Sequence, residues 1–170
     1  MPNRFSDHPM RESRLIVFRS LVLCALMVWL GGFAFYGAIV IPTAHHVLGT
    51  HLEVGFITQE VSNWLNYGGA LASFLLLINL ASADRSRTVL IGTLVVTWLA
   101  MCATQVALFV IHPHLDALMD PGQRTIIERE HFRALHRIYL LIASLQWGVG
   151  VAHVVALMAD WRGRDLRQTP

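Results

Sequence analysis

The fold is decided by a stretch that runs from Leu15 to Val40 and reads LIVFRSLVLCALMVWLGGFAFYGAIV. Its only charged residue is Arg19, near one end. A helix needs about 20 apolar residues to cross the roughly 30 Å of hydrocarbon in a bilayer, and this stretch is longer than that. Inside hydrocarbon each backbone N–H and C=O must be paired within the protein, and a helix pairs them all. We therefore predict a transmembrane helix here.

Three further stretches have the same character, and they are Val61–Leu80, Thr88–Ile111 and Ile138–Ala159. The whole chain is 55% hydrophobic and 14% charged, which is too apolar for an ordinary soluble domain. We therefore predict an all-α protein, an integral membrane four-helix bundle. Its expected parts are a cytoplasmic arm over residues 1–14, a single four-span domain over residues 15–161 and a cytoplasmic tail over residues 162–170.

The arginines indicate the orientation of this bundle. The chain has thirteen arginines and no lysine, and nine of the arginines fall on the side of the two termini, namely Arg4, Arg11, Arg14, Arg19, Arg85, Arg87, Arg162, Arg164 and Arg167. Positive residues in short connections stay in the cytoplasm. Both termini are therefore predicted to be cytoplasmic, which places Ile41–Glu60 and His112–His136 on the outer face. We expect the plasma (inner) membrane of a bacterium and no nucleic-acid partner, because the arginines form no single patch.

Two connections carry helix-boundary signals. Thr50, followed three residues later by Glu53, fits a capping box and predicts that the second helix begins near His51. The third span is expected to end at His112, because a residue that precedes a proline, here Pro113, is disfavoured in helical conformation.

The fourth helix is predicted to start well before its apolar stretch. Asp120 and Pro121 suit the cap and first position of a helix, which would then run to about Trp161. Its first third would be amphipathic, with i,i+4 ion pairs such as Arg124 with Glu128.

The fourth helix also carries a heptad seam. Alternating steps of four and three residues connect Phe132, His136, Tyr139, Ala143, Gln146, Gly150 and His153. Burying the polar members, which are His136, Tyr139, Gln146 and His153, costs free energy unless each finds a partner. We favour hydrogen bonds across the bundle, to Asn66, Thr97, Thr104 or backbone carbonyls, because such bonds hold membrane helices together. The alternative is a polar path or ligand site along the bundle axis.

Histidine is unusually frequent, with nine residues, and seven of them lie on the predicted outer side. Neutral imidazole binds Zn, Cu and Fe, so a transition-metal or haem site is one hypothesis, with His46, His112, His114 and His136 as candidate metal ligands. No H-x-x-x-H or H-E-x-x-H spacing is present, however. We therefore favour histidines that decorate the membrane interface, and we predict no cofactor.

Several short motifs resemble a known family. They are Trp29-Leu30-Gly31-Gly32-Phe33 followed by Ile41-Pro42, then Pro113 with Leu118-Met119, and finally His131-Phe132-Arg133-Ala134-Leu135-His136. In these elements the chain, from Leu21 to Leu157, is similar to the four-span membrane family of unknown function typified by transmembrane protein 205. The resemblance implies four helices with an outer rim of proline and histidine, the family-motif positions being Pro42, Pro113, Phe132 and His136. It implies no established reaction.

No catalytic motif accompanies these features: the chain has no G-x-S-x-G elbow, P-loop or dinucleotide fingerprint. We expect a small multi-pass membrane protein that is not an enzyme and acts as a structural or accessory unit, or binds a membrane-protein partner or lipid. One alternative is a metal- or haem-binding membrane protein that uses the outer histidines. Another is a subunit of a small transporter or channel, whose path would follow Tyr139, Gln146 and His153 and would require a homo-oligomer.

Overall fold

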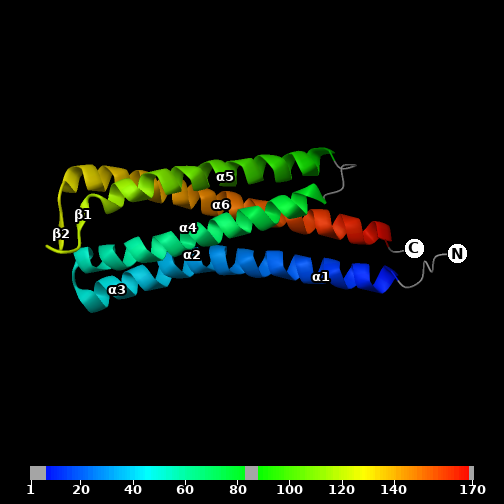
Figure 1. The fold of residues 1–170 in the computed structure, drawn as a ribbon, viewed down its shortest axis with the longest axis horizontal. Helices are drawn as coiled ribbons and strands as arrows, with labels where there is room; N and C mark the ends of the chain where they lie inside the picture. The colour runs from blue at the N-terminus through cyan, green and yellow to red at the C-terminus, as the bar shows by residue number, and fades with distance from the viewer. Residues whose placement is uncertain (1–6, 83–87, 169–170) are drawn as a thin grey trace.

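The computed structural model describes residues 7–82 and 88–168, which form an elongated bundle of helices with a small hairpin at one end (Figure 1). Within these residues four helices are long and apolar enough to cross a membrane, namely Ser13–Leu48, His51–Ala81, Thr88–Asp116 and Arg129–Arg167. The predicted transmembrane helical bundle is confirmed, and the chain is an integral membrane protein.

The first span is one unbroken helical run. Its segments are α1 (Asp7–Leu26), the π-helical turn η1 (Met27–Gly31), α2 (Gly32–Phe35), the π-helical turn η2 (Tyr36–Val40) and α3 (Ile41–Leu48). The helix continues through Ile41 and Pro42, so Ile41–Leu48, part of the segment predicted to lie on the outer face, is helical. A proline removes one backbone hydrogen bond from a helix, and the π-helical turn η2 lies directly before it.

The turn into α4 (His51–Ala81) is only two residues long. Gly49 ends α3 with φ 68°, a left-handed conformation that glycine adopts without strain. The Thr50 hydroxyl accepts a hydrogen bond from the Glu53 backbone N–H at 3.4 Å. The predicted start of the second helix at His51 is therefore confirmed.

Helix α5 (Thr88–Asp116) runs past Pro113, so the prediction that it ends at His112 is wrong. The reason lies in the His112 ring. Its Nδ1 lies 2.9 Å from the Asp116 carboxylate, one turn further along, and its Nε2 lies 3.3 Å from the Gln59 carbonyl oxygen of α4. These contacts keep the last turn of α5 helical, although a residue that precedes proline disfavours the helical conformation.

The segment after α5 forms a hairpin and not the start of a helix. Strands β1 (Met119–Asp120) and β2 (Thr125–Ile126) pair antiparallel, and the last helix, α6, spans Arg129–Gln168. The predicted helix start at Pro121 is therefore wrong, and so is the end near Trp161. Asp120 does cap a turn, since its Oδ1 accepts the N–H groups of the two residues after Pro121 at 2.9 and 3.0 Å.

The hairpin is tied to α4 by an ion pair. Arg124, at the tip with φ 49°, donates to the Glu53 carboxylate at 2.9 Å. The predicted pair of Arg124 with Glu128 does not form, because residue 124 belongs to the hairpin, so the two side chains do not share a helix face.

Buried side chains form two clusters along the bundle. The larger contains Trp29, Leu76, Met101 and Leu157, and the smaller, nearer the hairpin, is centred on Tyr139 with its neighbours on α5 and α6. The outside of the bundle is apolar instead, and it exposes Val28, Trp64, Val89 and Leu141 by 74%, 74%, 85% and 73%. Such an apolar outer surface is stable when lipid, and not water, surrounds the protein.

The start of α1 and the end of α6 lie at the same end of the bundle, opposite the hairpin (Figure 1). Of the predicted arm and tail, residues 1–6 and 169–170 lie outside the described residues, as do Arg85 and Arg87 of the second connection. The rest of the arm and the tail is helical, because α1 begins at Asp7 and α6 continues to Gln168.

Candidate functional site

The polar seam residues of α6 bond to neighbouring helices. The pairs are Tyr139 with Asn66 of α4 at 3.0 Å, Gln146 with Gln105 of α5 at 2.9 Å, and His153 with Thr97 of α5 at 2.7 Å. All of these residues except Thr97 are buried, and Thr97 is half-buried. The pairs satisfy the α6 side chains, which would otherwise be costly inside the bundle, and so hold α6 against its neighbours, while the buried Gln105 Nε2 has no partner.

A cavity of about 820 Å³ lies at the hairpin end, and we call it the hairpin cavity. Its walls come from α3 and α4, from the last turns of α5, from both strands of the hairpin, and from the first three turns of α6, through Leu140. Pockets that hold small organic ligands have volumes of about 300–1,000 Å³. The hairpin cavity is therefore large enough for such a ligand.

The floor of the hairpin cavity is buried and mostly apolar. Val54, Leu115 and Met119 line it together with Tyr139, and none of them is more than 7% exposed. The ring of His112 lies edge-on to the ring of Tyr139, with centroids 5.8 Å apart. The floor thus combines apolar surface with two polar rings whose hydrogen bonds go to protein groups.

The rim of the hairpin cavity is cationic. Of its three arginines, Arg124 is paired with Glu53. Arg129 and Arg133 lie one turn apart on α6, both exposed, and the Arg133 Nε donates to the Arg129 carbonyl at 3.3 Å. Among the described residues no carboxylate pairs with either of them. The rim therefore presents two positive charges that form no ion pair with a carboxylate among the described residues.

Histidine and aromatic rings complete the wall between floor and rim. His136 stacks on Phe132, with ring centroids 5.6 Å apart and planes 8° apart, and both side chains line the cavity. His45 and His51 face each other across the α3–α4 turn, with centroids 4.6 Å apart. These rings offer flat surfaces and hydrogen-bonding nitrogens next to the arginines.

The four candidate metal ligands are not gathered into one cluster. His112 and His136 line the hairpin cavity, whereas His46 and His114 are exposed and do not line it. Within residues 7–82 and 88–168, no three His, Cys, Asp or Glu side chains are placed so that they could hold a metal ion. The arrangement is that of a mixed apolar and cationic pocket.

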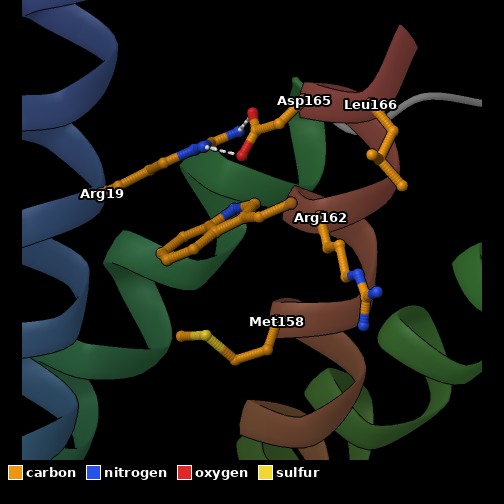
Figure 2. A pocket seen from close by; sticks show the side chains of 6 residues that line it. Arg19, Met158, Arg162, Asp165 and Leu166 are labelled. Atoms are coloured by element: carbon orange, nitrogen blue, oxygen red, sulfur yellow. Dashed lines mark hydrogen bonds and ion pairs between the residues drawn. The ribbon is translucent and has the colours of Figure 1, made fainter.

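The opposite end of the bundle is held by a clamp between the first and last helices. The Arg19 guanidinium of α1 donates two hydrogen bonds of 2.9 Å to the Asp165 carboxylate of α6 and lies over the Trp161 ring, 5.1 Å from its centroid (Figure 2). Trp161 in turn donates to the Asn79 side chain of α4 at 2.9 Å. A shallow surface pocket of about 450 Å³ beside this clamp is lined by Arg19, Trp161 and Asp165 together with Met158, Arg162 and Leu166. We interpret the clamp as structural, because its polar groups bond to one another.

Sequence reasoning missed the residues that give the hairpin cavity its character. Nothing in the sequence pattern singled out Arg129 or Arg133 as rim residues, and Met119 stood out only as part of the Leu118-Met119 motif. The i,i+4 spacing of Arg129 and Arg133 was the one available signal of a binding site, because two like charges on one helix face repel each other unless an anion lies between them. The hairpin that turns them toward a cavity was not predicted.

The family-motif positions fall into two groups. Pro42 and Pro113 are exposed within α3 and α5, while Phe132 and His136 line the hairpin cavity. No curated protein and no solved structure matches this chain. A family model described as Domain of unknown function (DUF4149) matches residues 24–124, which is more than half of the chain. The match includes the last three residues of α1, the rest of the first span from η1 to α3, and all of α4 and α5. The chain therefore belongs to the DUF4149 family of membrane proteins of uncharacterised activity.

Proposed function

We propose that this protein binds a membrane-soluble amphipathic ligand in the hairpin cavity. The observation that carries the proposal is the polarity gradient across one cavity, from the buried floor at Leu115 and Met119 to the exposed rim at Arg129 and Arg133. An amphipathic molecule has the same gradient. Ligand sites are typically apolar pockets with a few placed polar groups, and the hairpin cavity has this composition.

The polar residues of α6 could serve either to hold the helices together or to bind a ligand. The seam residues of α6 are already hydrogen-bonded to Asn66, Gln105 and Thr97. They therefore hold the helices together and have few hydrogen-bonding groups left for a ligand. The rim residues Arg129 and Arg133 have no carboxylate partner among the described residues. We therefore assign cohesion to the seam and binding to the hairpin cavity, with no catalytic role.

The orientation is part of the proposal. We propose that the hairpin cavity opens on the outer face of a bacterial inner membrane and that both termini are cytoplasmic, on the support of the arginine distribution. Reporter tags fused before Met1 and after Pro170 should both report the cytoplasm. A periplasmic signal from either tag would contradict this orientation.

We also propose a closer relationship, within four-span membrane proteins, to the family typified by transmembrane protein 205. Its support is the motif set at Pro42, Pro113, Phe132 and His136. Phe132 and His136 lie beyond residues 24–124, the segment that the DUF4149 model matches.

Ligand binding can be tested with a substitution whose side chain fills the hairpin cavity. A Cβ on Gly55 would lie 3.4 Å from the flexible Met119 side chain and point into the cavity wall, so Gly55→Leu should occupy the space with little strain. The control is Gly92→Leu, because a Cβ on the exposed Gly92 meets nothing within 4 Å and Gly92 does not line the cavity.

Native mass spectrometry of the purified protein in detergent, with dioleoyl phospholipids added, measures the bound amphiphile. We expect Gly55→Leu to weaken retention by about tenfold or more, equivalent to about 1.4 kcal/mol, and Gly92→Leu to leave it unchanged. Equal retention by the two variants, with both folded by circular dichroism, would mean that the cavity is not the binding site.

A further inference from the structure

The charge balance of the hairpin cavity identifies the head of its ligand. This step rests on the proposed function. Among the described residues that line the cavity, Asp116 is the one carboxylate, and it pairs with His112, while the rim Arg124 pairs with Glu53 of α4. Arg129 and Arg133 are the rim cations that form no ion pair with a carboxylate among the described residues. Asp120, Glu128 and Glu130 also lie at this end but do not line the cavity. The lining residues therefore carry an excess of positive charge at the mouth.

Guanidinium groups one helical turn apart suit one particular kind of anion. Arg129 and Arg133 lie at i and i+4, so their side chains leave the same face of α6 and repel each other unless an anion lies between them. A phosphate group has several acceptor oxygens and can accept from both guanidinium groups at once.

The depth of the cavity indicates what the phosphate is attached to. The α6 wall extends from Arg129 to Leu140, about 16 Å along the helix axis at 1.5 Å per residue. Leu140 lies within the apolar stretch that faces lipid and is 44% exposed. A ligand with its phosphate at the arginines therefore has room for an apolar chain along the floor, and the chain can enter beside Leu140 from the bilayer.

From these observations we infer that the hairpin cavity binds an anionic phospholipid, with its phosphate between Arg129 and Arg133 and an acyl chain against the apolar floor. Arg133 and Arg129 precede Ile138, where the apolar stretch of α6 begins, by five and nine residues. The head therefore lies just outside the apolar stretch, as a phosphate does in a lipid leaflet. A zwitterionic phospholipid with the same chains lacks the net negative charge, so it should bind less well.

The test compares two lipids that differ only in their heads. Native mass spectrometry of the full chain in detergent, with equal amounts of dioleoylphosphatidylglycerol and dioleoylphosphatidylcholine, should show a preference for phosphatidylglycerol of about tenfold. The double variant Arg129→Gln and Arg133→Gln should lose this preference. The double variant Arg129→Lys and Arg133→Lys should keep most of the preference. That result would show that the loss in the glutamine variant is due to the missing charge.

The matched control is Arg137→Gln, one turn further along α6. Arg137 is exposed but does not line the hairpin cavity, so its loss should leave the lipid preference unchanged. Equal binding of the two lipids by the unmodified protein would overturn the inference. If Gly55→Leu still removed both lipids in that case, the proposed function would stand without it. Displacement of phosphatidylglycerol by inorganic phosphate alone would also overturn the inference, because the acyl chain would then contribute nothing.

Discussion

Substitution of Gly69 by alanine tests how tightly the first span is held in the bundle. A Cβ at this position of α4 would meet the Gln105 side-chain oxygen closer than any real contact allows, and the Trp29 ring at 2.8 and 3.0 Å. Neither neighbour can move easily. Trp29 is 4% exposed within the larger core cluster, and Gln105 is held by its hydrogen bond to Gln146.

Two opposing terms determine how much the substitution changes the free energy of unfolding. Overfilling a close-packed site costs about 1–3 kcal/mol. Replacing glycine by alanine within a helix contributes about 0.5–1 kcal/mol in the opposite direction. We therefore expect Gly69→Ala to lower the free energy of unfolding by about 1–2 kcal/mol.

Two other helical glycines, one on α4 and one on α6, serve as controls because they have more space around them. A Cβ on Gly68 would lie 3.8 Å from Trp29, an ordinary contact, and a Cβ on Gly148 would meet nothing within 4 Å. Alanine at either position should leave stability unchanged or raise it by up to about 1 kcal/mol. Reversible unfolding of each variant in mixed detergent micelles measures the difference. If Gly69→Ala proved as stable as Gly68→Ala, the close approach of Trp29 to α4 would be refuted.

Three further predictions concern polar contacts of different burial. Arg164→Leu should cost about 3–5 kcal/mol of stability, because Asp160 is fully buried and would lose its ion-pair partner; adding Asp160→Leu should recover much of that loss in the same unfolding assay. Asn79→Leu should cost about 1–2 kcal/mol, because the buried Trp161 N–H would lose its acceptor, and the tryptophan emission should shift. Glu53→Gln should cost less than about 1 kcal/mol and make stability less dependent on salt, because its partner at the hairpin tip is exposed; a larger loss would show that the hairpin is held mainly by this ion pair.

The parts of the fold that were predicted correctly depend on local sequence. The four spans follow from runs of apolar residues, whose need for internal backbone pairing does not depend on which helix lies next to which. The start of α4 follows from Thr50 and Glu53, three residues apart.

The parts that were predicted wrongly depend on distant contacts. Asp120 bonds two nearby backbone N–H groups whether it caps a helix or a turn, so the local pattern could not distinguish the two. The hairpin gains the contact of Arg124 with Glu53, which is 71 residues away in sequence. In the same way His112 keeps α5 helical at Pro113 through a bond to α4. The hairpin cavity depends on both contacts, and for that reason it could not be predicted from the sequence.

The filling of the bundle axis below the hairpin cavity decides between a binding site and a path through the protein. Under Tyr139 lie the bonded pair of Gln146 and Gln105 and then the Trp29 ring, which a Cβ on Gly150 would meet at 3.1 Å. A solute that enters at the rim therefore meets a floor of close-packed and hydrogen-bonded side chains. To let it pass, one protomer would have to break these bonds and leave buried polar groups unpaired. A ligand that enters and leaves at the hairpin end, or sideways beside Leu140, breaks none of them. The cavity is therefore closed toward the bundle axis, and under the proposed function its floor also provides the apolar surface for the ligand.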